Sequence, residues 1–231
     1  MQKLCFAFLV ISISFLIIFS LKCNDPSVET VYPLSSSSAV LVIDAGHGGE
    51  DGGASSVTGA LESHINLAVA RRLELVLGLF GVHMLPLRES DISLHDPQAK
   101  TLRQKKVSDL NNRVKTVQSQ ENPVLLSIHQ NSYPDSRYSG AQVFYAPTQG
   151  SRELAQIIQE SLRLTLDPTN TRQEKQIPDT IFLMNHISCP GVLVECGFLT
   201  NPREDRLLCD HIYQTKLAVA LAGGYLRSVR T

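Results

Sequence analysis

Two histidines and two glutamates stand where they could serve one metal-dependent reaction. The residues are His47 after the apolar run VLVIDA, Glu62 in the first turn of a predicted helix, His129 after LLSI, and Glu195 after GVLV. Taken singly, each has a structural explanation, since a glutamate in a first helical turn is favoured by the helix dipole. Taken together, two imidazoles, one carboxylate and an open position form a catalytic zinc site, and a second carboxylate can move protons. The four positions are far apart in the sequence, so the fold must assemble the site.

The glycine-rich stretch GHGGEDGGA, residues 46–54, permits another interpretation, a loop that binds a nucleotide phosphate. A dinucleotide-binding fingerprint needs glycine at its first, third and sixth positions, and counted from Gly46 the sixth position is Asp51. Gly-Lys-Ser and Gly-Lys-Thr are also absent from the loop. We therefore expect no nucleotide ligand, and interpret the stretch as a turning backbone that delivers His47.

Apolar runs and amphipathic segments alternate from Ala39 onward, which predicts an α/β fold. Strands are predicted at 39–45, 82–88, 122–130, 140–147, 181–185 and 191–198, and helices at 61–81, 107–120, 151–166 and 210–228. This order favours a single catalytic domain with a mostly parallel twisted sheet and helices on both faces. In open α/β sheets, ligands bind at the carboxyl ends of strands, where His47, His129 and Glu195 are expected. Residues 91–107 are polar and non-periodic, which predicts a surface excursion of unknown role.

Composition agrees with one globular domain. The chain has 231 residues, of which 43% are hydrophobic and 19% charged, and its net charge of -1 gives no reason to expect nucleic acid as a partner. Cysteine is too sparse for a disulfide scaffold, and buried thiols are favoured. The extended spacing from Cys189 to Cys196 argues against a bridge between them, while a bridge from Cys209 to either one stays open.

The first residues predict export. Residues 1–23 carry an early lysine and then an uncharged apolar run from Leu4 to Leu21, which is typical of a signal peptide but also reaches the length of an N-terminal membrane anchor. Lipid attachment at Cys23 is a third possibility, although Lys22 is a poor residue before a lipidated cysteine. Residues 24–39 contain two prolines and a serine run and are interpreted as a flexible linker, followed by the catalytic domain at 40–231. The expected location is the periplasm or cell envelope, with a membrane tether left open.

Four stretches resemble, in order and spacing, the zinc-dependent N-acetylmuramoyl-L-alanine amidases of the type 3 family: VIDAGHGGEDGGA, ALESHINLA, LLSIHQNS and GVLVECGFLTNPRED. The resemblance covers nearly the whole predicted domain. It implies one Zn²⁺ held by His47, Glu62 and His129, with Glu195 as the catalytic acid and base. It also implies that the chain binds peptidoglycan and cleaves the amide bond between the lactyl group of N-acetylmuramic acid and L-alanine. The HExxH helix of many metalloproteases is absent.

Zinc chemistry explains the roles that the resemblance implies. A zinc ion polarises an amide carbonyl and lowers the pKa of bound water to about 7, and Glu195 would carry the water's proton to the departing amine. Three further residues are weaker candidates. Asp44 is expected either to orient His47 or to be held by loop N–H groups for structural reasons, Asn131 to bond the substrate from the strand face of His129, and Arg113, where the family carries an arginine, to form a structural ion pair.

Other functions remain alternatives. The same zinc, water and glutamate could serve a peptidoglycan peptidase that cuts within the stem peptide, and a non-catalytic wall-binding module would require the loss of a ligand or of Glu195. The segment between His129 and Glu195 is too short for the long inserted helix by which some family members block their zinc. We therefore expect a permanently accessible site. Whether an activator protein exists, and whether the enzyme serves cell separation, remodelling or recycling, stays open.

Overall fold

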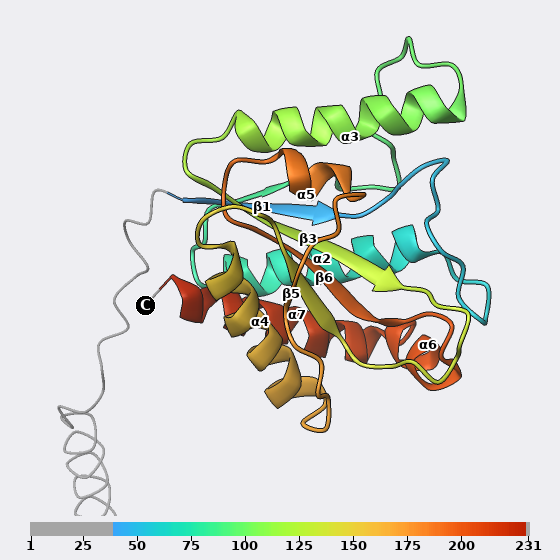
Figure 1. The fold of residues 1–231 in the computed structure, drawn as a ribbon, viewed down its shortest axis with the longest axis vertical. Helices are drawn as coiled ribbons and strands as arrows, with labels where there is room; N and C mark the ends of the chain where they lie inside the picture. The colour runs from blue at the N-terminus through green and yellow to red at the C-terminus, as the bar shows by residue number, and fades with distance from the viewer. Residues whose placement is uncertain (1–38, 230–231) are drawn as a thin grey trace, which may run out of the picture. The chain divides into compact units, whose positions relative to one another are not determined.

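Six strands form one sheet in the computed structural model, which describes residues 39–229 (Figure 1). The sheet order is β2-β1-β3-β6-β4-β5. The strands are β1 (Val40–Ala45), β2 (Met84–Pro86), β3 (Pro123–Asn131), β4 (Gln142–Tyr145), β5 (Lys175–Gln176) and β6 (Gly191–Phe198). β2, β1, β3 and β6 are mutually parallel, whereas β4 pairs antiparallel with β6 and parallel with β5. The predicted mostly parallel sheet is confirmed.

Helices cover both faces of the sheet, as predicted (Figure 1). The helices are α2 (Glu62–Gly78), α3 (Leu102–Gln118), α4 (Ser151–Leu166), α5 (Phe182–His186), α6 (Pro202–Leu208) and α7 (His211–Ser228). On one face α2 contacts β1 and β3, α4 contacts β4 and β6, and α7 packs against α2 and α4. On the other face α3 contacts β3 and α5 contacts β6, and these two helices also contact each other.

The alternation of side chains along β1 explains why both faces are covered. Val40 and Val42 belong to an apolar cluster that includes Val117 of α3 and Met184 of α5. The intervening residues of β1 are also buried and point to the opposite face, toward α2. A strand that is apolar on both sides is stable only between two layers of helices.

Two predicted segments differ from the structure. Residues 181–185, predicted as a strand, lie at the short helix α5, because a brief apolar run fits either element and packing against α3 and β6 decides. The surface excursion at 91–107 ends in helix, since α3 begins at Leu102. Thr101 caps that helix by accepting from the backbone N–H of Gln104, whose side chain bonds back to Thr101. This capping box is a signal that the sequence contains.

The remaining expectations concern the cysteines and the N-terminal region. Cys189, Cys196 and Cys209 are free, and the first two are buried as expected, whereas Cys209 is exposed. The predicted signal or anchor at 1–23 and most of the linker lie outside the described residues. Among the helices at 39–229, none combines the length and apolarity needed to cross a membrane.

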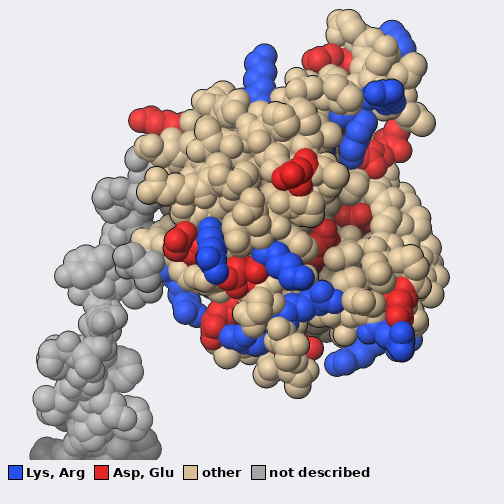
Figure 2. Space-filling view, viewed as in Figure 1, with Lys and Arg blue, Asp and Glu red and all other residues tan. Residues whose placement is uncertain are grey.

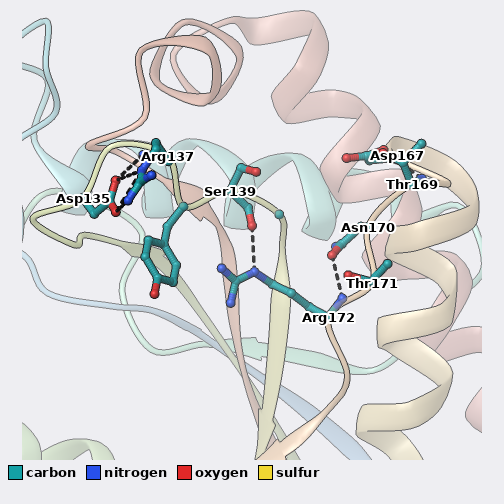
Figure 3. A pocket seen from close by; sticks show the side chains of 10 residues that line it. Asp135, Arg137, Ser139, Asp167, Thr169, Asn170, Thr171 and Arg172 are labelled. Carbon is teal, nitrogen blue, oxygen red and sulfur yellow. Dashed lines mark hydrogen bonds and ion pairs between the residues drawn. The ribbon is translucent and has the colours of Figure 1, made fainter.

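Two of the pockets in the described domain bear on the function. One is a hollow lined by acidic side chains and by His47 and His129, and Figure 2 shows recessed acidic side chains on the face viewed there. The other, of about 550 Å³, lies between the loops at 135–140 and 167–172. Figure 3 shows the polar side chains that line it, among them Arg172 and the ion pair of Asp135 with Arg137.

Candidate active site

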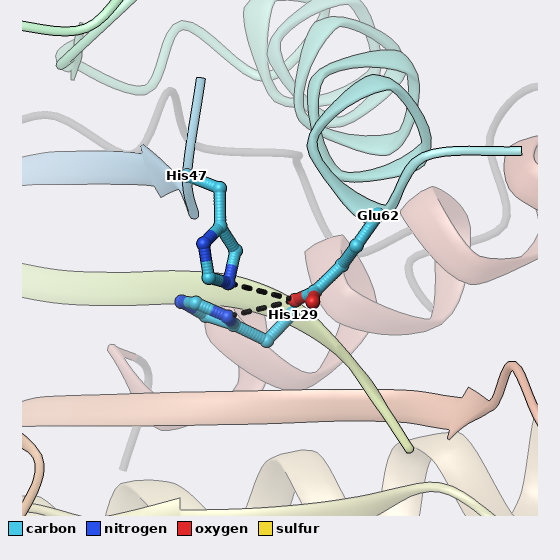
Figure 4. Close-up of side chains that lie close together, drawn as sticks. All are labelled: His47, Glu62 and His129. Carbon is cyan, nitrogen blue, oxygen red and sulfur yellow. Dashed lines mark hydrogen bonds and ion pairs between the residues drawn. The ribbon is translucent and has the colours of Figure 1, made fainter. Parts of the chain in front are cut away.

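His47 lies in the loop after β1 on a backbone that glycine adopts far more readily. Its φ is 63°, and Gly48 and Gly49 follow with φ values of 133° and 61°. A left-handed backbone costs a histidine conformational energy and persists only where contacts hold it. Arg113 Nη2 donates to the carbonyl oxygen of His47 at 2.8 Å, and Gly48 exchanges backbone hydrogen bonds with Asp51. The turn directs the imidazole toward β3 instead of along β1 (Figure 4).

Glu62 begins helix α2, and both oxygens of its buried carboxylate accept hydrogen bonds. Oε2 accepts from the backbone N–H of Ala54 at 2.9 Å, and Oε1 accepts from the backbone N–H of Gln130 at 3.1 Å. One helical turn later, Asn66 Nδ2 donates to Oε1 at 3.3 Å. The first-turn position also places the carboxylate at the positive end of the helix dipole. These contacts fix Glu62 in one orientation.

His129, near the carboxyl end of β3, packs against a residue that must be glycine. A Cβ on Gly46 would lie 2.2 Å from Cε1 and Nε2 of His129. A Cβ on Gly53 would lie 2.6 Å from Glu62 Oε2 and 2.8 Å from His47 Cδ2. No side chain fits at either position without moving these groups. The glycines of the loop therefore allow the close approach of the two imidazoles and the carboxylate.

The three side chains point toward one another from the β1 loop, α2 and β3 (Figure 4). Glu62 Oε1 lies 3.3 Å from His47 Nε2 and 3.0 Å from His129 Nδ1. One ligand atom from each residue lies within 4.8 Å of the others, a separation that one ion with metal–ligand bonds of about 2.0–2.2 Å can bridge. The structure thus brings together the three residues predicted as ligands, and two imidazoles with one carboxylate fit zinc.

The charges within this group favour a bound cation. Burial lowers the pKa of His47, but its bonds to Asp51 and Glu62 outweigh that effect and raise the pKa to about 9. Burial raises the pKa of Glu62, yet His129 and His47 hold it well below its usual range. The carboxylates therefore favour protonation of the His47 imidazole, and a metal ion that binds there competes with that proton.

Glu195 shares the pocket with these donors. It is the register partner of His129 across β3 and β6, and paired residues on neighbouring strands project to the same face. Among the described residues, its Oε2 atom is buried without a hydrogen-bond partner. Burial raises the pKa of Glu195 to about 7, with a further increase from the charge of Glu62, while His129 and His47 act in the opposite direction. A carboxyl group with such a pKa can both accept and return a proton near neutral pH.

Comparison with known proteins identifies the family. The family model described as N-acetylmuramoyl-L-alanine amidase, type 3, matches residues 41–226. The chain belongs to this family. The amidase match includes all four residues described above and nearly the whole of the described domain.

Individual relatives agree with that assignment. The germination-specific N-acetylmuramoyl-L-alanine amidase of Bacillus subtilis is 38% identical over 223 residues, covering 96% of this chain and 92% of the relative. The CwlD amidase of Clostridioides difficile, solved in complex with the GerS lipoprotein, has a TM-score of 0.79 and 39% identity, over 83% of this chain and 98% of that one. A further N-acetylmuramoyl-L-alanine amidase, from Clostridium difficile 630, has a TM-score of 0.72 and 27% identity, over 85% and 99% of the two chains. The chain is therefore an amidase of cell-wall peptidoglycan, and cell-wall amidases act outside the cytoplasm.

The amidase site contains a carboxylate that the sequence analysis missed. His47 Nδ1 donates to Asp51 Oδ2 at 3.0 Å, so Asp51 occupies the orienting role that was one expectation for Asp44. Asp44 instead accepts from Ser127 Oγ at 2.6 Å and is ion-paired with Arg113. Its role is the structural alternative, with side chains as partners in place of loop N–H groups. Only the spacing of Asp51 four residues after His47 in a glycine loop could have indicated its contact.

Arg113 forms the structural ion pair that the sequence favours. Its guanidinium is buried between Asp44 and Asp109, with Nε donating to Asp109 Oδ2 at 2.7 Å. Burial lowers the pKa of Arg113, but these two carboxylates raise it above its usual range. Burial raises the pKa of Asp44, and Arg113, His129 and Ser127 together bring it below its ordinary value. The pair joins α3 to β1 directly before the loop that carries His47.

The pocket around the donors has a volume of about 390 Å³ and combines polar and apolar surfaces. Asn131 and Ser132 line it after His129, and Ile181 and Phe182 contribute apolar side chains. Asn131 thus reaches the pocket, where its contact with substrate stays a prediction. Much of the apolar lining comes from the region of α5, whose helical form the sequence analysis did not predict, and Leu110 of α3 and Leu193 of β6 add to it.

Proposed function

We propose that this amidase uses one zinc ion, held by His47, Glu62 and His129, to cleave the bond between the lactyl group of N-acetylmuramic acid and L-alanine. One observation carries the proposal: three ligand atoms converge in a pocket that also contains the buried, unpartnered Oε2 of Glu195. Membership of the amidase family supports the choice of bond.

The donor set supports zinc as the metal. Structural zinc sites use four protein ligands, whereas catalytic sites use three and keep one position open. Imidazole and carboxylate also bind other first-row ions, so the choice of zinc rests on this donor set together with the family. When bound, the ion would supply a Lewis acid that polarises the amide carbonyl and makes water a better nucleophile.

Glu195 would move the proton that the reaction transfers. Its carboxylate accepts a proton from the attacking water as the new C–O bond forms at the amide carbon. It then donates that proton to the nitrogen as the C–N bond breaks, so that the peptide leaves as a neutral amine. Burial raises the pKa of Glu195 above that of an exposed carboxyl group, which favours the protonated form that returns the proton to the nitrogen.

Neighbouring residues would orient the reactants. Asp51 holds Nδ1 of His47, which leaves Nε2 facing Glu62. Asn131, which lines the pocket, is proposed to hydrogen bond the substrate. Ile181 and Phe182 would contact the small apolar groups beside the scissile bond, the lactyl and alanyl methyl groups.

The proposed setting is the cell envelope, reached through the N-terminal segment as a cleaved signal or as an anchor. The side chains of His47 and His129 are 19% and 20% exposed, which supports a site that substrate reaches without removal of a blocking segment. We therefore propose that the chain hydrolyses peptidoglycan without a partner. The relative solved with a lipoprotein supplies the alternative, an activator of the same kind for this chain.

Product analysis tests the proposed bond. The full-length chain, purified in detergent and loaded with zinc, is incubated with isolated peptidoglycan, and the released material is analysed by mass spectrometry beside a chelator-treated control. We expect stem peptides that begin with L-alanine and glycan with bare lactyl groups. Cleavage within the peptide would instead establish the zinc peptidase alternative. Release only after a lipoprotein is added would show that a partner is required.

A further inference from the structure

The loop that carries His47 is conformationally costly and needs support from outside. Three successive residues, His47 to Gly49, have left-handed φ values, and glycine lowers the cost at only two of them. Within the loop, Asp51 provides the support, since its Oδ2 accepts from His47 Nδ1 and its Oδ1 accepts from the backbone N–H of Gly53 at 3.2 Å. The Asp51 side chain is itself 36% exposed, so water competes for its oxygens.

The segment at 91–107, whose role the sequence left open, contacts this loop at three successive residues. Asp91 Oδ1 accepts from the backbone N–H of Gly49 at 3.0 Å. Lys105 is ion-paired with Glu50, and Lys106 is ion-paired with Asp51. The capping box at Thr101 starts α3 one turn before these lysines, so the helix presents both of them to the loop.

Lys106 differs from Lys105 in what its partner does. Lys106 Nζ contacts Oδ2 of Asp51, the same oxygen that accepts from His47. Lys106 also lines both the pocket of the three donors and the adjacent pocket of Ser93 and His95. Lys105 contacts only the adjacent pocket, and its partner Glu50 has a side chain that is 54% exposed and makes no contact with a proposed zinc ligand that the structure records among residues 39–229.

We infer that Lys106 is a positioning residue that acts on zinc binding through Asp51 and His47. The inference rests on the proposed zinc site. By pairing with Asp51, Lys106 holds the carboxylate in the orientation that fixes the ring of His47 and keeps Nε2 directed at Glu62. The segment at 91–107 thereby supports the proposed metal site.

The charge of Lys106 also has an effect opposite to that of its contact with Asp51, but this effect on zinc binding is smaller. The positive charge of Lys106 repels a cation in the site, which would weaken zinc binding. The Lys106 side chain is 44% exposed, however, so water and salt screen its field, whereas the orientation of Asp51 depends on direct contact. The net effect of removing Lys106 is therefore weaker zinc binding.

Zinc affinity of the full-length chain, measured by competition with a chromophoric chelator, tests this inference. Lys106→Met is expected to raise the Kd for zinc about 3–10-fold, below the 10–100-fold expected when a residue directly behind a ligand is replaced, as in Asp51→Asn. Lys106→Arg keeps a cation and should stay within about 2-fold of the wild-type Kd, and Lys105→Met, the matched control, should do the same. The double variant Asp51→Asn/Lys106→Met should bind zinc like Asp51→Asn alone, because both changes remove one interaction.

Three results would overturn the inference: unchanged zinc affinity in Lys106→Met, an equal loss in Lys105→Met, or additive losses in the double variant. Melting curves of the zinc-free Lys106→Met and Lys105→Met chains should match wild type, and a lower melting temperature for Lys106→Met alone would assign the loss to folding. Failure of the proposed function is distinguishable, since the wild-type chain would then bind no zinc.

Discussion

Two pockets of the domain, the one between the loops at 135–140 and 167–172 and the one around His47 and His129, differ in size and in how their polar groups are satisfied. In the larger one, of about 550 Å³, side chains bond to one another or to the backbone. Arg172 Nε donates to the carbonyl oxygen of Ser139 at 2.7 Å (Figure 3). The Arg172 guanidinium also lies 4.7 Å from the ring centre of Phe198, and Asn170 Nδ2 donates to the carbonyl oxygen of Ala141 at 2.8 Å. In the smaller one, of about 390 Å³, Glu195 Oε2 is buried without a partner among the described residues, and three side chains that could hold a metal ion converge.

The difference shows that volume alone does not identify a functional pocket. Leaving a buried carboxylate oxygen unpartnered costs free energy, and a fold retains such a group where a ligand or reactant uses it. In the larger pocket, polar side chains bond to each other and to the backbone within and between the loops at 135–140 and 167–172. The smaller pocket leaves Glu195 Oε2 unpartnered among the described residues, as the proposed metal and substrate site requires.

Removing a proposed ligand gives the largest expected effect. His129→Ala should abolish zinc binding and reduce peptidoglycan hydrolysis to the level of the chelated enzyme, because two ligands do not hold the ion. Zinc content of the purified variant and release of stem peptides measure both consequences. Full hydrolytic activity in a zinc-free variant would contradict the proposal that the reaction takes place in the smaller pocket.

Glu195→Gln should separate chemistry from metal binding. The amide cannot carry the proton, so hydrolysis should fall roughly 10²–10⁴-fold, the usual contribution of general acid–base catalysis. The zinc content and the melting temperature should remain close to wild type, since Glu195 Oε2 has no hydrogen-bond partner within residues 39–229. Wild-type rates in this variant would contradict the proton-transfer role.

Arg113→Met tests the structural ion pair next to the site. It leaves Asp44 and Asp109 without their buried partner, and the free energy of unfolding should fall by about 3–5 kcal/mol. Urea denaturation followed by circular dichroism measures the loss. Adding Asp44→Asn to the variant should recover part of the stability, and a double variant less stable than Arg113→Met would argue against the pair as the cause.

Arg172→Ala should have the smallest effect, in the larger pocket. Loss of its hydrogen bond to Ser139 and its contact with Phe198 should lower stability by about 1–2 kcal/mol. Hydrolysis rates should stay within about 2-fold of wild type. A loss of activity comparable to that of Glu195→Gln would place part of the chemistry in the larger pocket.

Prediction from sequence succeeded where local pattern and tertiary role agree. The apolar runs of β1, β3 and β6 read as buried strands, and His47, Glu62 and His129 meet at the sheet edge where parallel strands place ligands. These features depend on the period of the hydrophobic residues and on the parallel direction of the strands, and both can be inferred from the sequence.

Prediction from sequence failed where contacts between distant segments determine the local structure or the partner of a side chain. The five-residue helix α5 has too few turns to show a period. The first part of α3 carries mostly polar residues, so it lacks the apolar stripe that indicates a helix. The capping-box residues Thr101 and Gln104, however, are present in the sequence as a signal for the start of this helix. The choice of Asp51 over Asp44 as the partner of His47 follows from the left-handed turn at residues 47–49, so the four-residue spacing in the loop indicates the contact only once that turn is known.

The most direct test is anomalous diffraction at the zinc edge from crystals of the zinc-loaded chain. The account predicts one peak per chain, bonded to His47 Nε2, Glu62 and His129 Nδ1, in the pocket that contains Glu195. A zinc peak elsewhere, or no peak among these three side chains in an enzyme that still hydrolyses peptidoglycan, would contradict it.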